Sequence, residues 1–129
     1  MSPSEFRNYY ENTHMPLLLS LTGSFFPTSH TRHYLPRTLQ DPSSSDATNT
    51  NHIVTAYAGK VEDFEYDVYA ELVFESAEKF EAFARKLGEI EAAEDGVFYA
   101  DELAFLDLSK SKSVAIDEPV VTVAPSVVG

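Results

Sequence analysis

Apolar residues near the start of the chain recur at the spacing of one helix face. They are Phe6, Tyr10, Leu17 and Leu21. This stripe predicts an amphipathic helix over residues 2–22, and the pair Ser2 and Glu5 forms a capping box that would begin it. His14 lies on the same stripe, and Pro16 removes one amide from the helical hydrogen-bond ladder. We therefore expect a kink or an irregular turn near His14.

Three later segments have the character of strands. The first ends at Leu35, before Pro36; the second covers residues 53–58; the third, over residues 66–74, is the clearest. Alternation in the third predicts one face with Val68, Ala70, Leu72 and Phe74 and an opposite face with Asp67, Tyr69, Glu71 and Val73. Residues 38–52 are rich in Ser, Thr, Asn and Asp, which predicts a flexible polar loop.

The C-terminal half begins with a second helix, for which Ser76 is the predicted cap. Its apolar stripe contains Phe80, Phe83, Leu87 and Ile90. Gly96 breaks the chain, and a short helix is expected over residues 97–108, with an inward face made of Ala100, Leu103, Ala104 and Leu106. We expect a last strand at residues 113–116, followed by a Val-rich tail after residue 119 that either pairs with another chain or extends freely.

The order helix, strand, strand, helix, strand indicates one α+β domain over residues 1–129. It matches a ferredoxin-like layer, an antiparallel sheet with its helices on one face, except that a first strand before the opening helix is missing. We expect that strand to be lost from this chain or supplied by a partner. Because such a layer leaves one sheet face open, a homodimer is the physical expectation.

Composition narrows the range of partners. The chain has 129 residues and a formal net charge of −12, which argues against nucleic acid and anionic membranes as partners. It has no cysteine, so disulfides and thiolate chemistry are excluded. We find no apolar run long enough to span a membrane and no secretion signal at the start. A cytoplasmic location is therefore expected.

Several segments of the chain carry a family likeness. They are Ser2-Pro3-Ser4-Glu5-Phe6-Arg7, Tyr9-Tyr10, Thr13-His14-Met15-Pro16-Leu17, Tyr99-Ala100-Asp101-Glu102 and Phe105-Leu106-Asp107. Together they resemble the EthD-like family over most of residues 2–117. The resemblance implies a dimeric α+β barrel that works without a cofactor, in catabolism or in fungal and bacterial polyketide pathways. Some relatives decarboxylate aromatic polyketide acids, and others are described as oxidoreductases. The strand ending in an Arg/Lys-x-x-Gly turn that usually precedes the first helix is absent here.

His14 is the first candidate for chemistry, since an imidazole can give or take a proton near neutral pH. The alternative is a structural histidine that bonds a backbone carbonyl beside the Pro16 irregularity. Asp101, Glu102 and Asp107 are carboxylates that could orient the imidazole, unless they only form a solvated helix face; the resemblance favours Asp101 and Asp107. Tyr69 is a further catalytic candidate that we expect to line the cavity.

The candidates for substrate contact are mostly aromatic, which suits a flat hydrophobic ligand. They are Tyr10, Arg32, Tyr34, Tyr57 and Phe98. Arg32 or Arg37 could hold a carboxylate or phenolate, or only be solvated at the surface. His30 and His33 lie three apart, and in a strand they point to opposite faces, so a metal site is not expected. The sequence has no recognised motif for ATP, NAD or flavin, and no cofactor is expected.

Three functions follow from these observations. The first is a cofactor-independent enzyme that moves a proton through His14 during decarboxylation, cyclisation or dehydration of an aromatic polyketide-like acid. The second is a non-catalytic binding or assembly module with the same fold. The third is a cofactor-free oxygenase or oxidoreductase acting on an activated phenol, which would require dioxygen.

Overall fold

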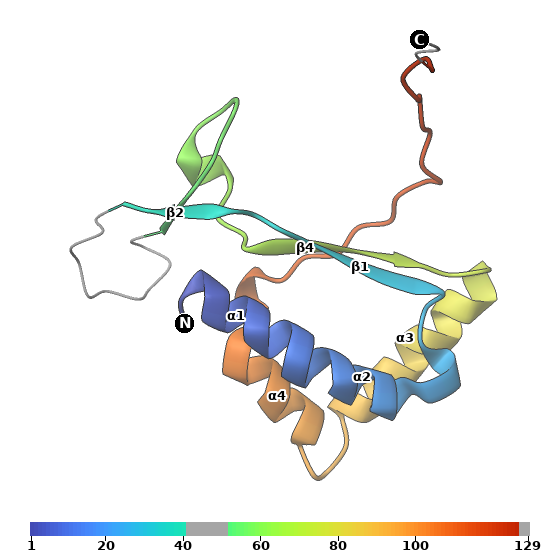
Figure 1. Cartoon of the computed structure of the whole chain (residues 1–129). Coiled ribbons are helices and arrows are strands. Elements are labelled where there is room, and N and C mark those ends of the chain that lie inside the picture. The colour runs from blue at the N-terminus through green and yellow to red at the C-terminus, as the bar shows by residue number, and fades with distance from the viewer. Residues whose placement is uncertain (41–51, 127–129) are drawn as a thin grey trace.

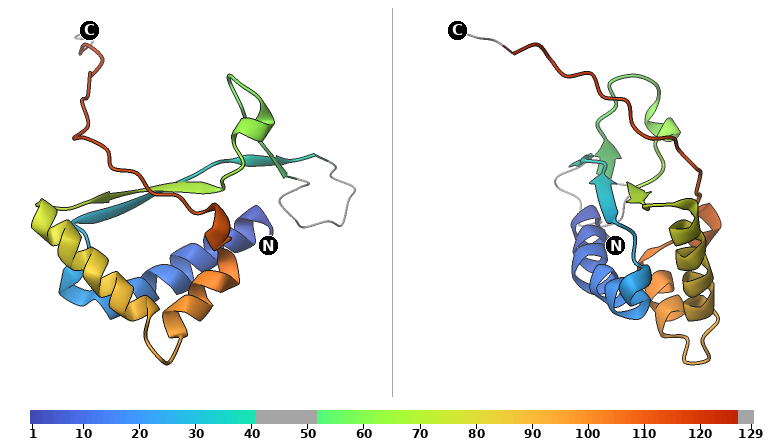
Figure 2. Two further views of the ribbon diagram at one scale, coloured as in Figure 1. Left: turned by 180° about the vertical axis from the view of Figure 1, so that it is seen from behind. Right: turned by 90° about the vertical axis from the view of Figure 1, so that its right-hand side faces the viewer.

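A computed structural model describes residues 1–40 and 52–126. It shows an α+β protein in which a layer of helices lies on one side of a long antiparallel strand pair (Figure 1). The last described segment, residues 111–126, has no regular secondary structure and leads away from the body of the molecule (Figure 2).

Four α-helices make the helical layer: α1 (Pro3–Tyr9), α2 (Met15–Thr22), α3 (Ala77–Glu91) and α4 (Val97–Phe105). Short 3₁₀ turns occur at Gly23–Phe25, Val61–Asp63 and Leu108–Lys110. Among the described residues, none of the helices combines the length and the apolar character that crossing a membrane requires.

The first helix begins as the sequence predicts, because Ser2 and Glu5 form a complete capping box. Between α1 and α2, Tyr10–His14 is one turn of π-helix, closed by a hydrogen bond from the Met15 amide to the Tyr10 carbonyl. This confirms the expected irregularity near His14, where Pro16 has no amide to donate. The helix ends at Gly23, whose φ of 53° suits a residue without a side chain.

The four strands are β1 (Ser29–Tyr34), β2 (Arg37–Leu39), β3 (His52–Val54) and β4 (Val68–Val73). β1 pairs with β4 and β2 pairs with β3, both antiparallel. In the long pair, His30, Arg32 and Tyr34 lie opposite Leu72, Ala70 and Val68. These six side chains share the face that looks toward the helices. The predicted loop 38–52 overlaps the end of β2, and its residues 41–51 lie outside the described part of the chain.

Two expectations for the C-terminal region are wrong. Residues 113–116 form no strand. The predicted inward face of α4 is also mostly exposed: Ala100 and Ala104 are exposed, and Leu103 is 53% exposed. The helix instead buries Phe98 and Asp101 and half-buries Phe105. The sequence prediction chose only apolar residues for the inward face of α4. It therefore missed the buried stripe, whose middle residue, Asp101, is a carboxylate that bonds to Tyr9 and His14.

The core lies between the first helical segment and α4. It contains Phe6, Tyr10, Met15, Leu18 and Phe98, each less than a tenth exposed. Phe105, Leu106, Leu87 and Ile90 are among the partly buried residues packed around it. This packing fixes α4 against the π-helical turn, and so determines what His14 faces.

Candidate active site

A buried histidine and a buried aspartate meet between the π-helical turn and α4. His14 and Asp101 are 6% and 7% exposed, and His14 Nδ1 lies 2.6 Å from Asp101 Oδ2. The π-helical turn presents the imidazole, and the buried stripe of α4 presents the carboxylate. We call these two residues the His14–Asp101 pair.

Tyr9 completes the surroundings of the carboxylate. Its hydroxyl donates to Asp101 Oδ1 at 2.9 Å, so each carboxylate oxygen has a donor. Burial and the neighbouring Asp101 raise the pKa of Tyr9, which keeps its hydroxyl protonated and donating at neutral pH. An ionised carboxylate only accepts hydrogen bonds, so the His14 proton lies on Nδ1 and Nε2 is left as a proton acceptor.

Aromatic rings enclose the imidazole. The centroid of the His14 ring lies 5.3 Å from that of Tyr10, 5.6 Å from Phe98 and 4.8 Å from Phe105. The Tyr10 contact is edge-on, and the other two are tilted. Such walls shield the bond to Asp101 from water, which strengthens it.

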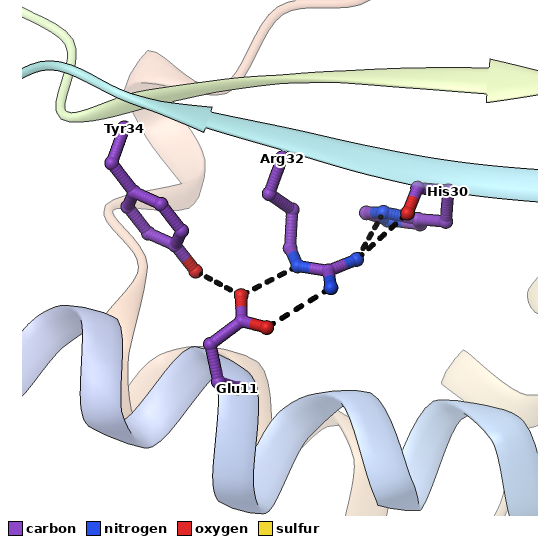
Figure 3. Close-up of polar contacts among 4 residues, drawn as sticks. All are labelled: Glu11, His30, Arg32 and Tyr34. Carbon is purple, nitrogen blue, oxygen red and sulfur yellow. Dashed lines mark hydrogen bonds and ion pairs between the residues drawn. The ribbon is translucent and has the colours of Figure 1, made fainter.

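A second polar cluster joins the π-helical turn to β1 (Figure 3). Glu11 accepts from Arg32 Nε at 2.5 Å and from Arg32 Nη2 at 3.0 Å, and the Tyr34 hydroxyl also donates to Glu11. Arg32 Nη1 lies 3.0 Å from His30 Nδ1 and donates to the His30 carbonyl at 2.9 Å. The Arg32 hydrogen bond lowers the pKa of Glu11, while burial, followed by the Glu11 bond, raises the pKa of Tyr34. We call these four residues the Glu11–Arg32 cluster.

This cluster changes the interpretation of two predicted substrate contacts. Arg32 and Tyr34 do face the helices, but Glu11 already occupies both of them, which leaves little of the guanidinium for a substrate carboxylate. No sequence pattern selected Glu11, and Tyr9 appeared only among the residues that carry the family resemblance. The only signal was indirect: an arginine and a tyrosine two apart in a strand, in an acidic protein, need a buried acceptor on the element packed against them.

The remaining candidates lie apart from the His14–Asp101 pair. Tyr69 stacks on His33, with ring centroids 4.4 Å apart, on the sheet face that points away from the helices. Tyr57 is 98% exposed, and Asp107 is exposed and caps the turn at Ser109. The opposite orientation of His30 and His33 follows the prediction, because only His30 faces the helices.

Arg37 and Glu102 are the two further residues that the sequence analysis named. Arg37 forms an ion pair with Asp67, at 3.1 Å, and donates to the Tyr66 carbonyl. Glu102 is partly buried beside the site, where burial, followed by the charges of Glu91 and Asp101, raises its pKa to about 7. Within residues 1–40 and 52–126, no three metal-ligating side chains gather in one place.

The fold and the site define a small α+β domain that carries a buried histidine–carboxylate pair in its helical layer. The chain belongs to the EthD family, since the family model of the EthD domain matches residues 1–109. That match covers both helices that build the pair and both strands of the long sheet. Comparisons with curated proteins and with solved structures found no match.

Proposed function

We propose that this EthD domain is a cofactor-independent enzyme that moves a proton through His14 on a hydrophobic, aromatic polyketide-like acid. The reaction would be a decarboxylation, a cyclisation or a dehydration. The observation that supports this most is the 2.6 Å contact between His14 Nδ1 and Asp101 Oδ2, in a pair that is almost fully buried.

The contact supports proton transfer for a chemical reason. Asp101 holds the imidazole in one tautomer and stabilises the positive charge that develops when Nε2 takes a proton. No described residue forms a hydrogen bond at His14 Nε2. This nitrogen is not among the fully buried atoms that lack a partner, so it is within reach of solvent or a ligand, as a reactive role requires.

The direct test is turnover of a panel of hydroxylated naphthalene- and anthracene-carboxylic acids and their polyketone precursors. Mass spectrometry would detect the loss of carbon dioxide or water. His14→Gln keeps the size and polarity of the side chain and should lower kcat about 10²-fold to 10⁴-fold. Glu94→Gln is the control, since Glu94 is exposed in the turn between α3 and α4, away from the His14–Asp101 pair and from the open sheet face. Full activity of His14→Gln would exclude the proposed role of His14.

The open face of the sheet supports a homodimer as the working form. This face, which points away from the helices, carries Tyr69 and Val73, which are 49% and 50% exposed. A second copy placed on this face would remove both from water, in the manner that the family resemblance implies. The oligomeric state in solution, measured by sedimentation, tests this part of the proposal.

A non-catalytic binding module is the second candidate, because one hollow in the molecule lies away from the His14–Asp101 pair. It has a volume of about 320 Å³ and is lined by Ser24, Phe25, Phe26, Thr28, Phe74, Glu75, Lys79 and Ala82. A ligand that binds there without turnover, and with the same affinity in His14→Gln, would favour this candidate. A cofactor-free oxygenase differs from the proton-transfer enzyme and from the binding module because it consumes dioxygen. Its turnover would therefore stop in an anaerobic assay.

A further inference from the structure

His30 is held in one tautomer by the arginine beside it. Arg32 Nη1 lies 3.0 Å from His30 Nδ1 and also donates to the His30 carbonyl (Figure 3). A guanidinium has donors and no acceptor, so Nδ1 of His30 must be the acceptor in this contact. The imidazole is therefore neutral, and its proton lies on Nε2.

The position of the Arg32 guanidinium beside His30 is itself fixed by other residues. Glu11 fixes the guanidinium through two of its nitrogens, and Tyr34 donates to the same carboxylate. The arginine side chain is 20% exposed, so this arrangement is largely protected from solvent. Burial, followed by the charge of Arg32 and by that of His14 when it is protonated, lowers the pKa of His30 to about 4, which agrees with the tautomer that the geometry requires.

His14 and His30 both have ring contacts with one tyrosine, Tyr10. The Tyr10 ring is 5.3 Å from the His14 ring and 6.3 Å from the His30 ring, edge-on to both. The two imidazoles have opposite tautomers: Asp101 leaves His14 with an acceptor at Nε2, and Arg32 leaves His30 with a donor at Nε2. Two titratable groups that their surroundings hold in different protonation states are a common basis for acid–base chemistry.

The sheet beside His30 is accessible. Its cross-strand neighbour Leu72 is 38% exposed although it shares the face that looks toward the helices, and Ala70 next to it is also exposed. The helices thus leave part of this face uncovered. A flat ligand resting on Ala70 and Leu72 would have an edge toward His30.

We propose that His30 is a second catalytic residue, which donates a hydrogen bond from Nε2 to a substrate oxygen that gains negative charge while His14 moves the proton. This inference rests on the function proposed above. It also narrows the substrate class to aryl ketones and hydroxyaryl acids that react through an enolate or phenolate oxygen.

The proton-abstraction step shows how the two residues share the work. His14 Nε2 forms a bond to a proton as the substrate C–H bond next to a carbonyl breaks. The released electron pair forms a carbon–carbon double bond, and the carbonyl π pair moves to oxygen. His30 stabilises that enolate oxygen without losing its proton, and Asp101 stabilises the imidazolium of His14. Return of the proton to carbon or oxygen restores His14.

The first experiment reads the tautomer without any turnover. Two-bond ¹⁵N–¹H correlation spectra of the full chain, recorded between pH 5.5 and 8, should show His30 neutral with its proton on Nε2 throughout. Arg32→Gln should remove that preference. A protonated His30 at pH 6, or a proton on Nδ1, would overturn the proposal whatever the enzyme turns over.

The second experiment separates catalysis from structure. His30→Leu removes the donor and should lower kcat about 10²-fold to 10³-fold with a smaller change in KM, while His30→Gln, which keeps an N–H donor, should recover part of the loss. Glu94→Gln, at an exposed position in the turn between α3 and α4, is the control. Full activity of His30→Leu in an assay where His14→Gln is inactive would also overturn the proposal.

A failure of the proposed function would look different, because no variant would then differ in turnover. The probe 1-hydroxy-2-naphthoate decides that case. It should shift the Nε2 resonance of His30 and bind at least about 10-fold more weakly to His30→Leu. If it does neither, His30 is not a ligand donor.

Discussion

Removing the carboxylate of Asp101 tests the site most directly. In Asp101→Ala, the hydroxyl of Tyr9 and Nδ1 of His14 both lose their acceptor, in surroundings where Asp101 is only 7% exposed. Hydrogen bonds to a charged partner contribute about 1.5 to 3 kcal/mol each. We therefore expect the free energy of unfolding to fall by about 3 to 5 kcal/mol.

Two milder variants divide this effect. Tyr9→Phe removes only one of the hydrogen bonds and should cost about 1.5 to 3 kcal/mol. Asp101→Asn keeps the volume of the side chain and should cost less than alanine. Its amide can donate to His14 Nδ1, which would move the histidine proton to Nε2 and remove the base. We expect kcat to fall about 10³-fold to 10⁴-fold while the fold persists.

Urea denaturation followed by circular dichroism measures the free energy, and Asp117→Ala, in the exposed segment after the last turn, is the control. The reasoning is refuted if Asp101→Ala loses less than about 1 kcal/mol, or no more than Tyr9→Phe. An Asp101→Asn variant that is folded and fully active would show that the His14–Asp101 pair is structural.

The remaining predictions concern charge, the Glu11–Arg32 cluster and assembly. The raised pKa of Glu102, about 7, means that the folded state holds a proton that the unfolded state loses near 4.5, so the thermal midpoint should fall as pH rises through this window. Glu102→Gln should flatten that dependence between pH 5 and 8, and an unchanged profile contradicts the assignment. A lysine in Arg32→Lys cannot reproduce the two hydrogen bonds to Glu11, so the free energy of unfolding measured in urea should fall by about 1 to 2 kcal/mol. An unchanged free energy of unfolding would show that the pair is only a surface contact. Val73→Glu places a charge on the open sheet face and should convert a dimer into a monomer by sedimentation; a dimer that persists places the interface elsewhere.

Local signals predicted much of the helical layer. The capping box and the missing amide of Pro16 depend on neighbours within a few residues, and the structure contains both features. The alternation in residues 66–74 predicted β4 for the same reason. Steric limits and hydrogen bonding between near neighbours decide such features, so the sequence alone contains them.

The site needed the tertiary structure. His14 and Asp101 are 87 positions apart, and no local pattern states that α4 turns its carboxylate inward while it exposes Leu103. A buried carboxylate is stable only with partners, and here they come from the first helical segment. The family resemblance selected Asp101 and Asp107, but only packing shows which carboxylate reaches the imidazole.

The two faces of the sheet also show which features the sequence determines and which depend on the tertiary structure. The sequence determined that Tyr69 and Leu72 point in opposite directions, because side chains alternate in any strand. It did not determine which face the helices cover. The structure places them on the side of His30 and Arg32, so Tyr69 lies away from His14. Alternation is a property of the strand itself, whereas burial depends on what packs against it, and that contact joins residues far apart in the chain.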